Sequence, residues 1–91
     1  MGIFFEWDFN KAKANIEKHH ISFEEAASVF GDNRAITIND PAHSANEKRE
    51  ITIGKSANNK LLVVVHTIRG NKLRIISTRK ASKKERKQYE E

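Results

Sequence analysis

The chain has 91 residues, of which 37% are hydrophobic, and a formal net charge of +5 at pH 7. So short a chain buries one modest core, which excludes a second domain and predicts one domain over residues 1–91. There is no cysteine, so disulfides and thiolate metal sites are excluded, as in many proteins of a reducing cytoplasm. The longest apolar run, residues 61–65, is far below the roughly 20 residues that cross a bilayer. We therefore expect a soluble cytoplasmic protein without membrane contact.

The first predicted elements are a strand and a helix. Residues 3–7 (IFFEW) are apolar and aromatic, which is typical of a strand. Asp8 is a candidate N-cap for a helix that ends near His19. The 3.6-residue period predicts that its buried stripe consists of Phe9, Ala12 and Ile16.

A second helix follows almost directly. Ser22 and Glu25 have the spacing of a capping box, and Gly31 is a typical helix stop. Its apolar face should consist of Phe23, Ala26, Ala27 and Phe30.

After Gly31 the hydrophobic period changes from about 3.6 to 2, which predicts strands. The run 61–68 (LLVVVHTI) is the most apolar, so it should be the central strand, buried on both faces. A tight turn at Arg69–Lys72 returns the chain antiparallel. The predicted strands lie near residues 34–39, 47–56, 61–68 and 73–79, with a loop at 40–46.

A short basic helix is expected to end the chain. Ser82 and Glu85 form a second capping box, and the helix runs toward Tyr89. It has almost no apolar stripe, so it either frays or docks onto something charged. The predicted fold class is α+β: a strand, two helices, an antiparallel sheet of about four strands and a C-terminal helix.

Positive charge is concentrated in the last quarter of the chain. Residues 1–68 carry a net charge of −1, and residues 69–91 carry +6. We expect this basic region to lie at a sheet edge. Such a patch is typical of a protein that binds a partner rich in phosphates or carboxylates, although a solvated tail that only aids solubility would have the same charge pattern.

Strand alternation suggests where these charges lie. In the last strand Leu73, Ile75, Ser77 and Arg79 should face one side, and Lys72, Arg74, Ile76 and Thr78 the other. If the strands pair in sequence order, one carboxylate and four guanidinium groups could converge on one end or face of the sheet. These candidate catalytic residues are Glu47, Arg49, Arg69, Arg74 and Arg79.

Guanidinium groups around a carboxylate suit the cleavage of a phosphodiester. Arginine donates paired hydrogen bonds to phosphate oxygens, and a nearby glutamate or histidine can accept a proton. In RNA the neighbouring 2′-hydroxyl can be the nucleophile, so neither metal nor cofactor is expected. For each arginine taken singly, a surface ion pair is the more common explanation.

The remaining polar and aromatic candidates are less specific. His19 and His20 are about 100° apart on a helix and cannot share one ligand. His43 is either a site residue or a turn former, and His66 in a buried strand is more typical of a core histidine. Trp7 either anchors the core or stacks a base.

Three segments together resemble the BrnT toxins of bacterial type II toxin–antitoxin systems: FEWDFNKAKANIEKHHISFEEAASVF, DPAHSANEKREITIG and LLVVVHTIRGNKLRIISTRKASKKERKQYEE. The resemblance implies a RelE-like fold and a metal-independent ribonuclease that inhibits translation. It also implies a DNA-binding antitoxin of the BrnA type as partner. The toxin itself would then contact DNA only indirectly, through this antitoxin. Besides the five residues above, the family pattern falls on Trp7, Lys18, His19, His43, Ser44 and Lys80. We take these as substrate-binding candidates, except for Ser44, which only belongs to the motif.

The chain departs from the family pattern where glycine commonly follows the first histidine, because it has His20 there. If that position needs a positive φ, the turn is strained. Another departure is Thr78, where the family often has alanine, and it changes no charge. Two alternatives remain open: a binding module that contacts nucleic acid without cleaving it, and a basic surface that serves an acidic antitoxin segment competing for the same arginines.

Overall fold

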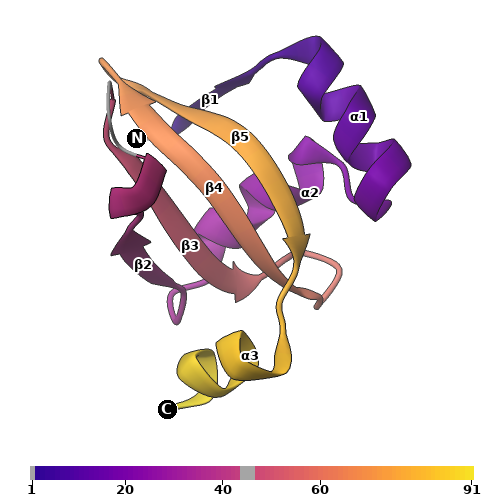
Figure 1. Cartoon of the computed structure of the whole chain (residues 1–91), viewed down its shortest axis with the longest axis vertical. Coiled ribbons are helices and arrows are strands. Elements are labelled where there is room, and N and C mark those ends of the chain that lie inside the picture. The colour runs from indigo at the N-terminus through magenta and orange to yellow at the C-terminus, as the bar shows by residue number, and fades with distance from the viewer. Residues whose placement is uncertain (1, 44–46) are drawn as a thin grey trace.

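The computed structural model describes residues 2–43 and 47–91, and Figure 1 shows its elements. They are, in chain order, β1 (Phe4–Trp7), α1 (Phe9–His19), α2 (Phe23–Ser28), the 3₁₀ helix η1 (Val29–Gly31), β2 (Ile36–Asn39), the 3₁₀ helix η2 (Pro41–His43), β3 (Arg49–Lys55), β4 (Leu61–Arg69), β5 (Lys72–Lys80) and α3 (Lys83–Glu90). The predicted α+β class and order of elements are confirmed.

The strands form a five-stranded sheet in the order β1-β5-β4-β3-β2. The strands β2 to β5 are the predicted antiparallel meander, with β4 at its centre. β1 pairs parallel with β5. The expectation that the last strand is a sheet edge is therefore wrong, because the N-terminal strand covers it.

One face of the sheet is covered by α1 and α2; in Figure 1, α2 lies behind the strands and α1 lies to the right of β5. We call it the helix face. Its core contains Phe23 and Val29 from the helical layer, and Leu62, Val64 and Ile75 from the sheet. The opposite face, which carries Ile53, Val63 and Val65 by register, is called the open face.

The predicted buried stripe of α1 is wrong at two of its three positions. Phe9 is 77% exposed and Ile16 is 47% exposed. The helix instead turns Asn15 inward, where its amide donates to the Ile21 carbonyl at 3.1 Å and accepts from the Thr78 N–H at 3.1 Å. The second bond fixes α1 against β5 and the first ties α1 to the segment that leads into α2. Hydrophobic periodicity does not indicate either bond.

The turns around α2 follow the sequence signals with two refinements. Ser22 caps α2 by accepting from the Glu25 N–H, but the Glu25 carboxylate accepts from the Ser56 hydroxyl, so the predicted reciprocal box is replaced by a tertiary contact. His20 has φ 60° and ends α1 in the left-handed region, the conformation that favours glycine.

A β-bulge in β5 changes which residues share a face. The pairing passes from Val65 with Ser77 to His66 with Ile75, so Ile76 has no partner. Because directly paired residues point to the same side, Leu73 and Ile75 lie on the helix face with Thr78. The predicted alternation is wrong beyond Ile75, and the bulge brings Arg79 onto the open face with Arg74.

The basic C-terminal helix is docked. Its capping box at Ser82 and Glu85 is present as predicted. Tyr89 is 9% exposed and packs with Ile53, Leu61 and Val63, while its hydroxyl donates to Asp32 at 2.7 Å. One aromatic side chain and the ion pair between Arg79 and Glu85, described below, therefore hold a helix that has no apolar stripe. None of the helices among residues 2–43 and 47–91 is long and apolar enough to cross a membrane.

Candidate active site on the open face of the sheet

A row of polar residues crosses four strands at one end of the open face. Glu6 on β1 pairs with Arg74 on β5, Arg74 with Thr67 on β4, and Thr67 with Arg49 on β3. Neighbouring strands are about 4.8 Å apart, so the Arg49 and Arg74 backbones are separated by roughly 10 Å. Thr67 between them is buried and donates to the Lys48 carbonyl at 2.7 Å, which ties the segment before β3 to the sheet.

That segment presents Glu47 to the row. Arg69 donates to Glu47 through Nε at 3.0 Å and Nη2 at 2.9 Å. This bidentate hydrogen bond lowers the pKa of Glu47, and the charges of Arg69, Arg49 and Arg74 lower it further. Arg74 also lies 3.5 Å from the carboxylate of Glu6. We call this group the Glu47 end: Glu6, Glu47, Arg49, Arg69 and Arg74.

A third ion pair lies at the other end of the open face. Arg79 donates to Glu85 of α3 through Nη1 at 2.7 Å and Nη2 at 2.8 Å. The same carboxylate accepts from the Ser82 N–H at 2.8 Å. The hydrogen bonds from Arg79 are the main cause that lowers the pKa of Glu85 to about 2, so the carboxylate is ionised at neutral pH. We call Arg79 and Glu85 the Arg79 end.

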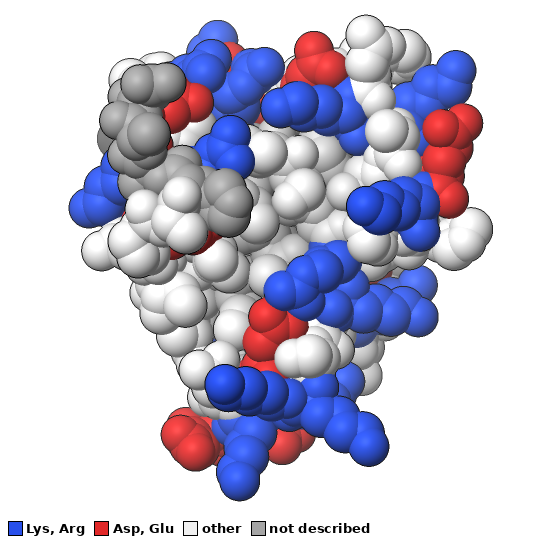
Figure 2. Space-filling model, in the orientation of Figure 1, with Lys and Arg blue, Asp and Glu red and all other residues white. Residues whose placement is uncertain are grey.

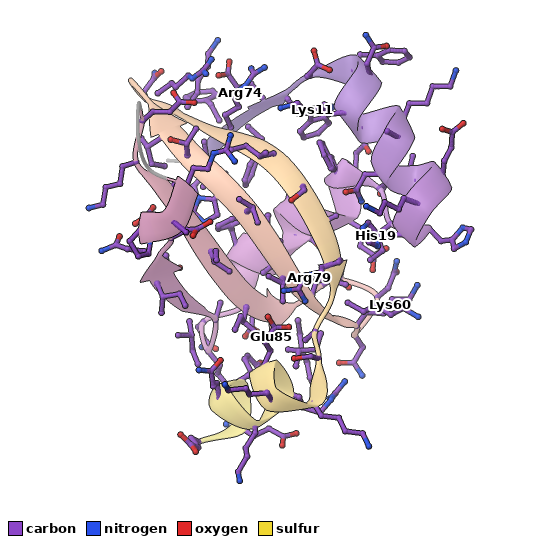
Figure 3. All side chains as sticks on the ribbon, in the orientation of Figure 1. Lys11, His19, Lys60, Arg74, Arg79 and Glu85 are labelled. Carbon is purple, nitrogen blue, oxygen red and sulfur yellow. The ribbon has the colours of Figure 1, made fainter. Side chains whose placement is uncertain are left out.

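The structure brings four of the five catalytic candidates together and leaves Arg79 apart. Arg74 and Arg79 lie toward opposite ends of β5 (Figure 3), five residues or about 16 Å along a strand. Figure 2 shows Lys and Arg side chains gathered above and below an uncharged centre. The candidate arginines therefore fall into two separate groups on one face, each with a carboxylate partner, and convergence on a single point is not what the structure shows.

The remaining candidates lie elsewhere. Trp7 packs edge-to-face against Phe23, with ring centroids 5.9 Å apart, on the helix face. Lys18 and His19 are in the last turn of α1. His43 ends η2, and Ser44 lies outside the described residues. Lys80 ends β5, next to Arg79.

His66 is a core residue, as its place in a buried strand indicated. It is 2% exposed, its Nε2 is 2.7 Å from the Thr52 hydroxyl, and its ring lies edge-on to Phe30. Burial lowers its pKa, against a smaller opposing effect of the Glu50 charge. No group of three or more metal-ligating side chains occurs among residues 2–43 and 47–91.

Two acidic residues of the site do not emerge from sequence analysis. Glu6 reaches Arg74 only because β1 pairs with a strand almost seventy positions later in the sequence, and no local sequence pattern predicts that pairing. Glu85 is recognisable as a capping residue, but a capping box does not indicate that the same carboxylate also holds Arg79.

Comparisons with known proteins show the family and the fold. A family model described as the ribonuclease toxin BrnT of type II toxin–antitoxin systems matches residues 7–85. The crystal structure of the Brucella abortus ribonuclease toxin BrnT is similar to the chain, with a TM-score of 0.70 and 25% sequence identity over 90% of this chain and 100% of that one. No curated protein matches the chain.

Proposed function

The chain belongs to the BrnT family of ribonuclease toxins of type II toxin–antitoxin systems, and from this premise we propose that its open face cleaves RNA without a metal ion. The observation that carries the proposal is the Glu47 carboxylate, held by Arg69 with Arg49 and Arg74 close enough to lower its pKa. Three guanidinium groups around one carboxylate supply both positive charge and a proton acceptor.

In the proposed reaction the 2′-hydroxyl of a ribose loses its proton and its oxygen attacks the adjacent phosphorus. The bond from phosphorus to the 5′-oxygen breaks, and that oxygen takes up a proton. The products are a 2′,3′-cyclic phosphate and a 5′-hydroxyl. Arg49, Arg69 and Arg74 stabilise the negative charge that builds up on the phosphate oxygens. Glu47 or a histidine moves the proton.

Arg79 binds a neighbouring phosphate in this proposal, because it lies at the other end of β5 from Arg74. Glu85 engages Nη1 and Nη2 of Arg79, and Nη1 also lies 3.3 Å from the Lys80 carbonyl. None of the described residues accepts a hydrogen bond from the Nε–H of Arg79. This N–H and the outer N–H of Nη2 form a second donor pair. That pair is the arrangement by which arginine binds phosphate. Glu85 thus orients Arg79 without using all its donors.

The test is cleavage of end-labelled RNA by the purified protein in excess EDTA. Wild-type protein should cut the RNA and leave 2′,3′-cyclic phosphate ends, whereas Arg74→Ala should lose most of the activity. Arg34→Ala is the matched control, since Arg34 is an exposed arginine outside both groups. RNA that stays intact with wild-type protein but binds it at low salt would replace the proposal by a binding module without catalysis.

Membership of the family implies an antitoxin partner. We propose that this partner is of the BrnA type, that it neutralises the toxin in the cytoplasm, and that the toxin meets DNA only through it. Unopposed expression should arrest translation and growth, and co-expression of the antitoxin encoded beside the toxin should restore both. Growth arrest that persists with Arg74→Ala, at equal protein level, would refute the link between cleavage and toxicity.

A further inference from the structure

A pocket of about 280 Å³ lies beside the Arg79 end, where β4 begins and β5 passes into α3. It is smaller than most sites for drug-sized ligands, so it suits a compact group. Of the described residues that line it, three are basic and none is acidic. They are Asn59, Lys60, Leu61, Lys80, Ala81 and Arg86.

The turn between β3 and β4 forms one wall of this pocket. In the β3–β4 turn the Ser56 hydroxyl accepts from the Lys60 N–H at 3.3 Å, and the Ser56 N–H donates to the Lys60 carbonyl at 2.8 Å. Ser56 is 7% exposed and its hydroxyl donates to Glu25 of α2. The turn that carries Lys60 is thereby anchored to the helical layer before any ligand arrives.

The other wall is fixed through α3. The Ala81 N–H donates to the Leu61 carbonyl at 3.0 Å, which continues the β-sheet pairing one residue beyond β5. Glu85 then holds the first turn of α3 on Arg79, and Tyr89 holds its last turn on Asp32. Arg86 follows Glu85 directly, so the contact that orients Arg79 also sets the position of Arg86. The backbone positions that carry Lys60 and Arg86 are therefore set before an anion binds, which lowers the ordering cost of binding.

We propose that this pocket binds a phosphate of the RNA strand next to the one held by Arg79, through Lys60 and Arg86. The inference rests on the proposed function, and it assigns two residues that neither the family pattern nor strand alternation singled out. Lys80 lines the pocket and directly follows Arg79 in the sequence, so the pocket adjoins the Arg79 end. An RNA backbone is the proposed occupant because its phosphates recur along one strand, so a strand held at Arg79 can place its next phosphate in the pocket that the neighbouring Lys80 lines. Figure 3 shows Arg79 and Lys60 toward the same end of the sheet.

The experiment measures the binding of a short, fluorescein-labelled 2′-O-methyl oligouridylate by anisotropy over a range of salt concentrations. This probe cannot be cut, because its 2′-oxygen carries no proton to lose. The variant is Lys60→Gln with Arg86→Gln. The matched control is Lys13→Gln with Lys84→Gln, which removes the same charge from exposed positions of α1 and α3 that do not line the pocket. Thermal unfolding verifies that all three proteins are folded.

The pocket variant should bind roughly tenfold more weakly than the control, and its log–log salt slope should be smaller by about 0.7 for each phosphate that it no longer neutralises. Equal affinity and slope in the two variants would overturn the proposal. So would an oligoglutamate peptide whose binding depends on Lys60 and Arg86 while that of the oligouridylate does not, since the pocket would then serve a protein segment.

These outcomes are separable from failure of the proposed function. If the wild-type protein binds the probe in a pocket-dependent way but leaves ordinary RNA uncut, the nuclease is refuted and the phosphate pocket stands. If it cuts ordinary RNA and the two variants bind alike, the pocket is refuted and the nuclease stands.

Discussion

Glu85 holds Arg79 through two charge-assisted hydrogen bonds of 2.7 and 2.8 Å. The two residues are six positions apart in the sequence and lie on different elements. The pair joins the last strand of the sheet to the C-terminal helix. The same carboxylate caps that helix through the Ser82 N–H. A single acidic side chain therefore positions an arginine of the open face and fixes the helix that carries Arg86.

The first prediction concerns the pH dependence of this pair. The pKa of Glu85 in the folded chain is about 2, lowered from the ordinary glutamate value of 4.5. A lowered carboxyl pKa contributes stability that is fully present above the unfolded value and is lost as pH falls through the folded value. Glu85→Gln should therefore unfold at a lower temperature than wild type at pH 7, and the difference should shrink between about pH 5 and pH 2.

Thermal unfolding followed by circular dichroism measures this difference. Glu90→Gln, an exposed substitution on the same helix, is the control and should track the wild type. A Glu85→Gln deficit that stays constant down to pH 2 would show that the ion pair is not its cause.

The second prediction separates the two ends of the open face. Arg74→Ala removes a donor to the reacting phosphate and should lower kcat by about 10²-fold or more. Arg79→Ala removes a contact to a phosphate that does not react, so KM should rise while kcat changes less. Steady-state cleavage of a short fluorogenic RNA gives both constants. The assignment fails if Arg79→Ala lowers kcat as strongly as Arg74→Ala.

The third prediction concerns the buried amide that fixes α1 to β5. Asn15 is 7% exposed and bonds both the Ile21 carbonyl and the Thr78 N–H. Asn15→Ala leaves these two backbone groups without their partner, so unfolding should become easier by about 1–3 kcal/mol. Urea unfolding measures the change. Asn10→Ala, at an exposed position of the same helix, should have little effect, and equal losses in both variants would argue against this role.

The fourth prediction concerns the left-handed residue that ends α1. His20 has φ 60°, which costs a residue with a Cβ about 1–2 kcal/mol and glycine almost nothing. His20→Gly should therefore stabilise the fold, by up to about 1 kcal/mol once the greater freedom of glycine in the unfolded chain is included. His20→Ala keeps the Cβ and should not stabilise it. Comparing both in urea isolates the backbone effect, and a destabilising glycine would contradict it.

The fifth prediction concerns His66, whose folded-state pKa is lowered from 6.5 chiefly by burial. The unfolded chain then binds a proton that the folded chain resists, so stability falls as pH drops below about 6.5. His66→Gln keeps a polar group for Thr52 and should flatten this part of the stability profile. Melting temperatures between pH 7.5 and 5 test it, with His19→Gln as control. An unchanged slope in His66→Gln would exclude His66 as its source.

The α+β class and the order of its elements could be predicted because local signals were strong. The capping box of Ser82 and Glu85 predicts α3, and the change of hydrophobic period after Gly31 predicts the sheet. The apolar run of β4 predicted its central place for the same reason, since only a strand with neighbours on both sides buries so many apolar side chains in sequence. These features depend on residues a few positions apart, and the sequence alone determines them.

What only the tertiary structure decided depends on distant pairings. The bulge at Ile76 moves Arg79 to the face of Arg74, because one unpaired residue reverses every side chain beyond it. The parallel pairing of β1 brings Glu6 to Arg74, and the docking of α3 brings Glu85 to Arg79 and Arg86 to its pocket. Residue types and charges could be read in advance, but their grouping into two ends of one face required the three-dimensional pairing of segments far apart in the chain.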